Sequence, residues 1–523
     1  MHIDFSNISE NLARTYGDAE CVVNVERGRR YSFREFHHLS NRIVNMMMRR
    51  LELRRGDVWY NILNNDNLSV LGWMTAFKGE ATACYSNTTD SLETQETQLS
   101  LVKPRVVFVE AELLPTHYEL LKKHGMTIIS MDPPGPEYAD VLHFWDLLDG
   151  VRDTNPGVTS DSRQDCMVLR FTGGTTGAPK AVMYSIDNLL GGRDLHYATA
   201  DPMAARSERM LHFGMISHAS GIVYFPVLFK GGCTVTMNDR SLLTFCQTVE
   251  RERITCSLMV PSMLYHMLEA PEVKDHDLSS LTTMYYGASP MNPTRLKQLR
   301  EQFGNIFVQL YGSSEHAGAV SCLGKAEHFP DANGREAHLS SAGRIVPGVE
   351  VVIMGNHGKP VPDGEDGEIW MRSRTICMGY LHNPQKTAEE FCDSFWKSGD
   401  VGRIDSEGYL YVLDRLKDTI VHKECNVYPN QVEAALMAHE TVMMAAVVGI
   451  PDPSCGEWVH AEVVLRGGEE IDGEALREFV GQRLAAYNVP RTISFAQQLP
   501  LSPVGKVLRR VVREACRQNF ETN

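Results

Sequence analysis

The 523-residue sequence has no long hydrophobic run: no stretch approaches the roughly 18 apolar residues that a membrane-spanning helix needs. The N-terminus, MHIDFSNISENLARTYG, lacks the basic start and apolar run of a secretory signal, and the last residues, FETN, are not a peroxisomal address. The twelve cysteines include no close pair such as CxxC, which is typical of reduced thiols. The sequence therefore predicts a cytoplasmic protein without a membrane span.

The chain also lacks an excess of positive charge. Its 51 Lys and Arg residues against 66 Asp and Glu residues give a formal net charge of −15. This balance argues against nucleic acid as a partner, although it allows a small anionic ligand in a locally basic pocket. A hydrophobic content of 43% with 22% charged residues predicts a globular protein. There is no internal repeat and no low-complexity tract.

Predicted strands alternate with predicted helices through the first two thirds of the chain, which indicates an α/β fold with largely parallel sheets. Strands are expected at 167–171, 180–184, 209–213, 233–237, 255–260, 281–286 and 306–311, and helices at 222–229, 242–253 and 293–303, after Ser185 and from Pro261. Short strands and glycine-rich turns at 343–411 predict a β-rich subdomain. A second alternating pattern follows, so we expect an N-terminal domain at 1–415 and a C-terminal domain at 416–523.

The stretch FTGGTTGAPK at 171–180 combines three glycines, three threonines and a lysine, and it buries little apolar surface. Backbone N–H groups, hydroxyls and one ammonium suit the wrapping of an anion. The alternative is an ordinary Gly/Thr turn between two strands. The Walker pattern GxxxxGK[ST] does not fit, because Lys180 follows a proline and precedes Ala181.

This stretch resembles the phosphate loop of the adenylate-forming superfamily, which contains acyl-CoA synthetases, luciferases and adenylation domains. Six further segments resemble motifs of that superfamily in the same order: SHASG (217–221), YYGASP (285–290), QLYGSSEHAG (309–318), WKSGDVG (396–402), DRLKD (414–418) and LSPVGKVLRR (501–510). One short match carries little weight, but seven in order cover nearly the whole chain. The sequence is identified as a member of this superfamily.

The resemblance implies a luciferase-like fold, with two α/β subdomains, a β-rich subdomain and a small mobile α+β C-terminal domain. It also implies an AMP-forming acid–thiol ligase of fatty-acid-type metabolism that uses ATP, Mg²⁺ and coenzyme A. A carboxylate would attack the α-phosphorus of ATP, pyrophosphate would leave, and the acyl-adenylate would then pass its acyl group to a thiol.

Residue roles follow from the resemblance by position. The phosphates of ATP are expected at Thr172, Gly173, Gly174, Thr175, Thr176, Gly177 and Lys180. Adenine and ribose are expected at Gly287, Ala288, Ser289, Gln309, Leu310, Tyr311, Gly312, Asp400 and Arg415. Glu315, beside Ser314, would hold Mg²⁺, which favours carboxylate and phosphate oxygens. Lys506 would bridge the carboxylate and the α-phosphate, and Lys417 would be the hinge of a C-terminal domain that rotates between half-reactions.

For several of these residues the sequence alone leaves a structural interpretation open. His218 is either a satisfied core histidine or a residue that gates the acyl pocket, and Tyr311 either packs in the core or stacks on adenine. Glu315 could be a solvated carboxylate, Asp400 the cap of a turn, and Lys506 one of a run of solvated basic residues.

The sequence defines less closely which group accepts the acyl moiety and which carboxylic acid is activated. Lys423 and Glu424 are expected at the pantetheine tunnel, where Glu424 in HKECNVYP replaces a usual glycine and could narrow the channel. The alternatives are a carrier-protein thiol or another acceptor, or a degenerate nucleotide-binding protein without turnover. Ala317 and Gly318 leave room and Tyr286 fills space, which favours a medium-sized aliphatic or alicyclic acid. No basic residue marks a second carboxylate, and a homodimer is left open.

Overall fold

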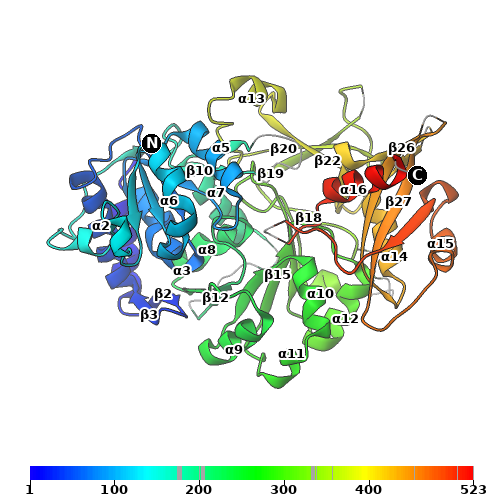
Figure 1. Cartoon of the computed structure of the whole chain (residues 1–523), viewed down its shortest axis with the longest axis horizontal. Helices are drawn as coiled ribbons and strands as arrows, with labels where there is room; N and C mark the ends of the chain where they lie inside the picture. Colours follow the sequence, from blue (N-terminus) through cyan, green and yellow to red (C-terminus); the bar gives the residue numbers. More distant parts are fainter. Residues whose placement is uncertain are drawn as a thin grey trace.

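The computed structural model describes residues 1–172, 179–199, 201, 207–330, 336, 338–355, 357–423, 425–452, 454–502 and 505–521. Figure 1 shows the N-terminal third in blue and cyan at the left, the middle of the chain in green and yellow, and the C-terminal residues in orange and red at the right. Within the described residues, no helix has the length and apolar character that crossing a bilayer requires.

The N-terminal α/β subdomain is built on a seven-stranded sheet. Its strands are parallel, except that β11 pairs antiparallel with β10. In spatial order they are β11 (Ala181–Tyr184), β10 (Val168–Phe171), β5 (Thr82–Tyr85), β4 (Val58–Ile62), β6 (Val106–Val109), β7 (Thr127–Ser130) and β8 (Leu142–His143). The glycine-rich stretch therefore joins two strands, as the sequence predicts, and the structure adds that these strands are adjacent and antiparallel.

A nine-stranded sheet forms the second α/β subdomain. In spatial order its strands are β18 (Arg344–Ile345), β17 (Ser321–Leu323), β16 (Phe307–Tyr311), β15 (Thr283–Gly287), β14 (Cys256–Met259), β12 (Arg209–His212), β13 (Cys233–Thr236), β2 (Glu20–Asn24) and β3 (Arg29–Ser32). The six strands from β16 to β2 are parallel. The carboxyl ends of β12, β15 and β16 lead into three of the sequence motifs, which is where open α/β sheets bind ligands.

Helices cover both sheets: α1 (Phe5–Tyr16), α2 (Phe33–Arg49), α3 (Asn65–Leu71), α4 (Trp73–Lys78), α5 (Leu92–Val102), α6 (Leu114–Lys123), α7 (Ile186–Tyr197), α8 (Tyr224–Phe229), α9 (Leu242–Glu252), α10 (Pro261–Glu269), α11 (Glu272–Asp275) and α12 (Pro293–Phe303). Their starts are encoded locally: Ser185 caps α7 through a capping box, and prolines open α10 and α12. The single helix predicted at 222–229 is wrong in detail. A 3₁₀ turn at Ala219–Val223 precedes α8, whose first turn accommodates Pro226 because that position needs no N–H donor.

The β-rich subdomain follows as an antiparallel sheet of β19 (Val349–Met354), β20 (Gly367–Ser373), β22 (Phe395–Ile404), β21 (Phe391–Cys392) and β23 (Leu410–Arg415), with helix α13 (Pro384–Glu390) before β21. Register places Asp400 of β22 directly opposite Arg415 of β23. Two residues far apart in the sequence are thus fixed side by side by strand pairing.

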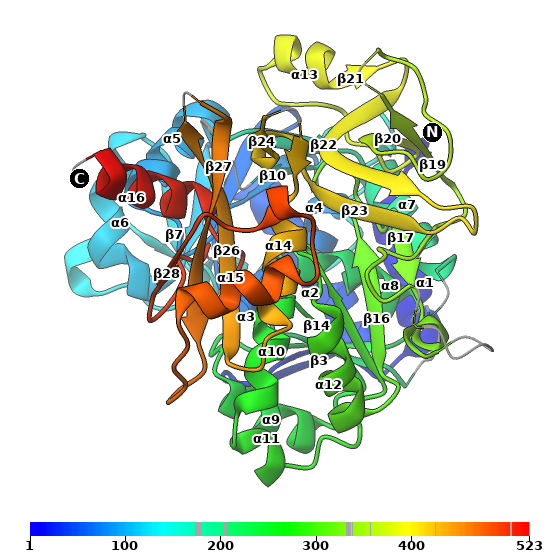
Figure 2. The same ribbon diagram turned by 90° about the vertical axis from the view of Figure 1, so that its right-hand side faces the viewer.

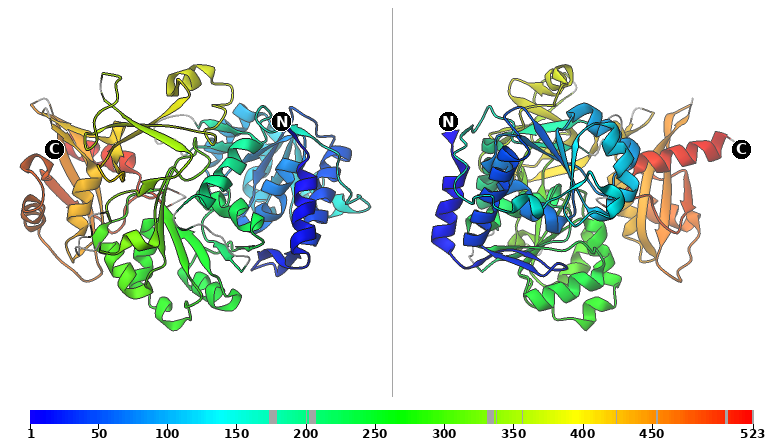
Figure 3. Two further views of the ribbon diagram at one scale, coloured as in Figure 1. Left: turned by 180° about the vertical axis from the view of Figure 1, so that it is seen from behind. Right: turned by 60° about the vertical axis from the view of Figure 1, so that its left-hand side comes forward.

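The C-terminal residues form a separate sheet, visible in front in Figure 2 and set to one side in Figure 3. It consists of β24 (Ile420–His422), β25 (Cys425–Val427), β26 (Val442–Asp452), β27 (Gly456–Leu465) and β28 (Thr492–Phe495), with helices α14 (Pro429–Met437), α15 (Gly473–Gly481) and α16 (Arg509–Glu521). Val432, Val447, Ala461 and Leu476 are buried in its own hydrophobic core. The α+β character is as predicted; the boundary at 415/416 stays a prediction.

Candidate active site

The two ends of the predicted phosphate loop are held together by the β10–β11 hairpin. The Thr172 N–H donates to the Lys180 carbonyl at 3.1 Å, and the buried Thr172 hydroxyl has no hydrogen-bond partner among the described residues. The Lys180 ammonium lies 2.9 Å from Glu390 and 4.5 Å from the centre of the Tyr380 ring. Gly173, Gly174, Thr175, Thr176 and Gly177 lie outside the described residues.

Glu315, which follows β16, is buried with 8% of its surface exposed. The Tyr380 hydroxyl donates to Glu315 Oε1 at 3.0 Å, and within the described part of the chain no cation lies within ion-pair distance. Burial raises the pKa of the Glu315 carboxyl. A buried carboxylate that lacks a cationic partner fits a magnesium ligand, and the interpretation as a solvated surface residue does not agree with the burial.

Asp400 and Arg415 form an ion pair, with Arg415 Nε 2.7 Å from Asp400 Oδ1. The Tyr311 hydroxyl donates to the other oxygen, Oδ2, at 2.6 Å. The Asp400 N–H bonds to Ser398 Oγ at 3.0 Å, and the aspartate is only 5% exposed. Its acceptor oxygens are therefore oriented by two donors from different strands, an arrangement suited to receiving sugar hydroxyls. Burial raises the pKa of the Tyr311 hydroxyl, and the negative charge of Asp400 raises it further.

The turn after β15 carries Gly287, Ala288 and Ser289. A Cβ at Gly287 would lie 2.1 Å from the Leu310 carbonyl oxygen, so glycine is needed for β15 to approach β16. Ala288 is exposed and has φ of 68°, a left-handed conformation that is unusual for alanine. Gln309 accepts a hydrogen bond from Tyr286 at 3.1 Å and so faces the core, and Gly312 packs against the Gly318 carbonyl.

Lys506 reaches this region from the C-terminal domain. Ser262 of α10 donates to the Gly505 carbonyl at 3.0 Å and fixes the segment on the nine-stranded subdomain. The Lys506 side chain remains accessible to solvent, but the surrounding protein displaces water and lowers its pKa, with the charge of Arg415 acting in the same direction and Asp400 opposing it. The charge of Lys506 thus interacts with both members of the Asp400–Arg415 pair.

His218 lies in the loop after β12, and its ring nitrogens contact Ser217 Oγ at 2.9 Å and Asn87 Nδ2 at 3.3 Å. Burial lowers the pKa of His218 to about 3, and the charges of Arg170, Lys506 and Arg240 add to the shift. The ring is therefore neutral at physiological pH. The charge of Lys506 therefore acts on His218, whose role at the acyl pocket stays a prediction.

Comparison with known proteins identifies the family. The AMP-binding enzyme family model matches residues 9–381, and the AMP-binding enzyme C-terminal domain model matches residues 431–506. The chain belongs to the AMP-binding enzyme family.

Three similar proteins are a CoA ligase, a CoA synthase and an amide bond synthetase. The medium/long-chain-fatty-acid–CoA ligase FadD8 of Mycobacterium tuberculosis is 36% identical over 366 residues, covering 68% of this chain and 63% of that protein. The feruloyl-CoA synthase of an Amycolatopsis species is 36% identical over 368 residues, covering 70% and 73%. The amide bond synthetase McbA of Marinactinospora thermotolerans matches with a TM-score of 0.86 and 26% identity, covering 98% and 100% of the two chains. The predicted superfamily, fold and class of enzyme, an AMP-forming acid ligase of the acyl-CoA ligase type, are confirmed.

In this AMP-binding enzyme, the residues predicted as the hinge and the pantetheine tunnel lie directly after β23, at the start of the C-terminal residues. Lys417 lies in a short 3₁₀ turn at Leu416–Asp418, directly after Arg415. Burial lowers its pKa. Lys423 is exposed at the turn between β24 and β25 with φ of 56°, and its N–H donates to the Cys455 carbonyl at 2.7 Å. Glu424 lies outside the described residues.

Sequence reasoning missed the residues that support the site. Tyr380 and Glu390 contact Glu315 and Lys180, yet they lie in no recognised motif, and neighbouring Glu389 and Glu390 look equivalent in the sequence. Asn87 supports His218 from a loop 131 residues earlier in the chain. A sequence signal for these contacts is lacking because each depends on tertiary packing.

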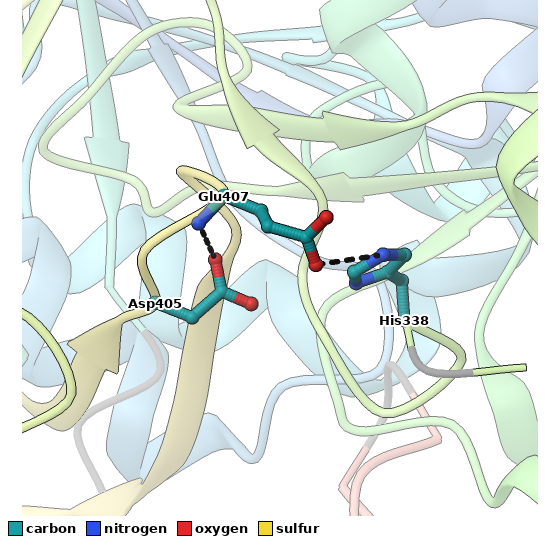
Figure 4. Close-up of side chains that lie close together, drawn as sticks. All are labelled: His338, Asp405 and Glu407. Atoms are coloured by element: carbon teal, nitrogen blue, oxygen red, sulfur yellow. Dashed lines mark hydrogen bonds and ion pairs between the residues drawn. The ribbon is translucent and has the colours of Figure 1, made fainter. Parts of the chain in front are cut away.

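One further cluster could hold a metal by its residue types: His338, Asp405 and Glu407 (Figure 4). Asp405 Oδ1 accepts from the backbone N–H groups of Glu407 and Tyr409, at 3.0 and 2.9 Å, which is the pattern of an Asx turn. The His338 ring stacks on Tyr409 with 3.6 Å between the ring centres. These contacts explain the cluster as a capped turn, so we assign no metal to it.

Proposed function

We propose that the chain is an ATP-dependent acyl-CoA ligase that activates a medium-sized aliphatic or alicyclic carboxylic acid as its acyl-adenylate. The observation that carries this proposal is the position of Lys506 in the C-terminal domain: the hydrogen bond from Ser262 to the neighbouring Gly505 docks its segment on the N-terminal domain, and its charge interacts with the Asp400–Arg415 ion pair. All twelve cysteines are free thiols, which supports a reducing compartment such as the cytoplasm. Light scattering would measure whether the chain forms a homodimer.

In the first half-reaction a carboxylate oxygen of the acid attacks the α-phosphorus of ATP, and the bond to the pyrophosphate oxygen breaks. Both reactants are anions, so catalysis consists mainly of charge neutralisation and positioning. Lys506 holds its ammonium at the reacting centre, Lys180 faces the outer phosphates, and Asp400 receives the ribose hydroxyls. Glu315 would hold Mg²⁺, which supplies additional positive charge to the phosphate oxygens when bound.

In the second half-reaction the thiol sulfur of CoA attacks the acyl carbonyl, the carbon–oxygen bond to AMP breaks, and AMP leaves with its phosphate oxygen. Rotation of the C-terminal domain about Lys417 would withdraw Lys506 and bring the β24–β25 turn to the same centre. The arrangement described here, with Lys506 at the ribose-binding pair, supports the adenylation half of this cycle.

A second acceptor class is favoured by specific relatives. The family includes a fatty acid–[acyl-carrier-protein] ligase of Streptomyces coeruleorubidus, 31% identical over 414 residues, as well as the amide bond synthetase. The adenylation machinery would be identical, and only the group that attacks the acyl-adenylate would differ.

Measuring AMP release for a panel of aliphatic, alicyclic and aromatic acids, with and without CoA, tests both points. We expect acid-dependent pyrophosphate release, and AMP release that CoA accelerates. Adenylation without any thioester would assign the acceptor to another nucleophile, and absence of adenylation with every acid would overturn the proposed function. A preference for aromatic acids, such as the one named for the feruloyl-CoA relative, would overturn the acid class alone.

A further inference from the structure

Glu390 is the last residue of α13, and it holds the lysine that ends the phosphate loop. Its Oε1 lies 2.9 Å from the Lys180 ammonium, and the two side chains are 20% and 30% exposed. The pair is therefore partly shielded from water, where charge-assisted contacts are stronger than on an open surface. Any phosphate group that binds Lys180 must compete with this carboxylate.

The same oxygen of Glu390 has a second cation within reach. Lys386, one helical turn earlier in α13, has its ammonium 3.3 Å from Glu390 Oε1 and 3.1 Å from Glu389. Because Lys386 and Glu390 are spaced i, i+4 on one helix, their contact does not depend on Lys180. Glu390 can therefore release Lys180 without being left as an unpaired carboxylate.

Tyr380 joins this pair to Glu315. Its hydroxyl contacts Glu390 Oε2 and lies 3.0 Å from Glu315 Oε1. A tyrosine hydroxyl carries one proton and can donate it to one carboxylate at a time. Glu390 thus contacts Lys180 directly and shares Tyr380 with Glu315, and these are two of the charged groups that the proposed function assigns to ATP and its metal.

We propose that Glu390 is a positioning residue for the ATP reaction. It is the counter-ion of Lys180 before the nucleotide binds. When ATP binds, Lys180 exchanges Glu390 for the nucleotide phosphates, and Glu390 keeps Lys386 as its cationic partner. This inference rests on the proposed function, because it takes Lys180 as a phosphate ligand. The exchange weakens phosphate binding and thereby helps pyrophosphate to leave after adenylation. ATP affinity is set by a competition within the protein and not by Lys180 alone.

The competition predicts opposite effects for two substitutions. E390Q removes the competing charge, so the dissociation constants of a nonhydrolysable ATP analogue and of pyrophosphate should each fall about three- to tenfold. K386M removes the alternative partner of Glu390, strengthens its hold on Lys180, and should raise both constants about two- to fivefold. E389Q is the matched control, since Glu389 is the neighbouring residue on α13 and contacts Gln385 and Lys386 but not Lys180. Nucleotide binding should change less than in E390Q.

The measurement is a calorimetric titration of each full-length variant at fixed Mg²⁺, with thermal unfolding to confirm folding. Weaker or unchanged binding by E390Q would overturn the exchange, because a residue that merely supports the fold or the metal would give that result. If E390Q does not fold, K386M decides the matter alone, and unchanged or tighter binding there overturns the proposal. Wild-type protein that binds no nucleotide would overturn the proposed function itself, whereas normal wild-type binding with no tightening in E390Q would remove only the role of Glu390.

Discussion

Replacement of Lys506 by alanine should abolish adenylation selectively. Lys506 is the cation that the C-terminal domain brings to the Asp400–Arg415 pair, and its ammonium would face the charge that develops during attack on the α-phosphorus. At a separation of about 4 Å and an effective dielectric near 20, one unit charge is worth about 4 kcal/mol, close to a thousandfold in rate. Since the side chain is accessible to water, we expect a loss of roughly a hundred- to a thousandfold.

The assay for Lys506→Ala is acid-dependent exchange of labelled pyrophosphate into ATP, which reports the adenylation step alone. Thioester formation from synthetic acyl-adenylate and CoA is measured in parallel and should be retained, because Lys506 is expected to act only in the first half-reaction. An exchange rate within a factor of two or three of the wild type would refute the role of Lys506. Equal losses in both assays would point to a general structural defect.

The pH dependence gives a second test of the same residue. Only the ammonium form is useful, so activity is lost as pH rises through the pKa of Lys506. Because the surroundings lower that pKa, kcat/KM for ATP should fall at a pH below the ordinary lysine value. Bound phosphates favour the charged form, so the corresponding fall in kcat should lie at higher pH. In Lys506→Arg this alkaline limb should vanish, since arginine stays protonated.

Three other substitutions have separate readouts. Asp400→Asn should raise KM for ATP about ten- to a hundredfold while leaving KM for the acid unchanged, because it removes a charged acceptor from the ribose hydroxyls; an unchanged KM for ATP in steady-state kinetics would contradict this. Glu315→Gln should shift the Mg²⁺ concentration for half-maximal pyrophosphate exchange upward, and an unshifted Mg²⁺ titration would count against Glu315 as a ligand. Gly287→Ala places a methyl 2.1 Å from the Leu310 carbonyl and should destabilise the fold by about 1–3 kcal/mol. A Tm equal to that of the wild type would show that the two strands can separate freely.

The sequence predicts the fold well where local chemistry decides it. The capping box at Ser185 and the prolines at 261 and 293 start helices by satisfying or removing N–H donors, and these starts agree with the structure. The stretch 222–229 departs from the prediction, since apolar periodicity cannot show where a 3₁₀ turn gives way to an α-helix at Pro226. The residue at which such a helix begins depends on whether one backbone N–H group is available as a hydrogen-bond donor.

For the site, the sequence motifs predict which charged residues take part, but they do not predict which residues pair with them. Asp400 and Arg415 are predicted as separate ribose contacts, and the structure adds that they pair with each other through strand register. For Tyr311 the sequence leaves core packing and stacking on adenine open, and the structure adds that its hydroxyl donates to Asp400. The partners Tyr380 and Glu390 could not be predicted, because an ordinary tyrosine and one of two adjacent glutamates acquire their roles only by folding against Lys180 and Glu315.

Asp414 helps to hold the segment that carries Lys506 in the orientation that the proposed function requires. The sequence shows only an aspartate in a motif where glycine is common. In the structure, its side chain is 1% exposed, and Arg509 Nη1 lies 2.8 Å from its Oδ1. Arg509 also binds Glu433 at 2.7 Å, and the Asn430 N–H donates to Asp414 Oδ2 at 2.8 Å.

Asp414 belongs to β23 of the β-rich subdomain, whereas its partners belong to the C-terminal domain, so this buried network spans the predicted hinge. Arg509 follows Lys506 by three residues, and the network therefore fixes the segment that carries Lys506 to the strand that carries Arg415. Because a charge left unpaired in such a setting is costly, the domain cannot turn away without transferring Asp414 and Arg509 to new partners or to water. The orientation that we propose for adenylation is thus a discrete state held by specific contacts.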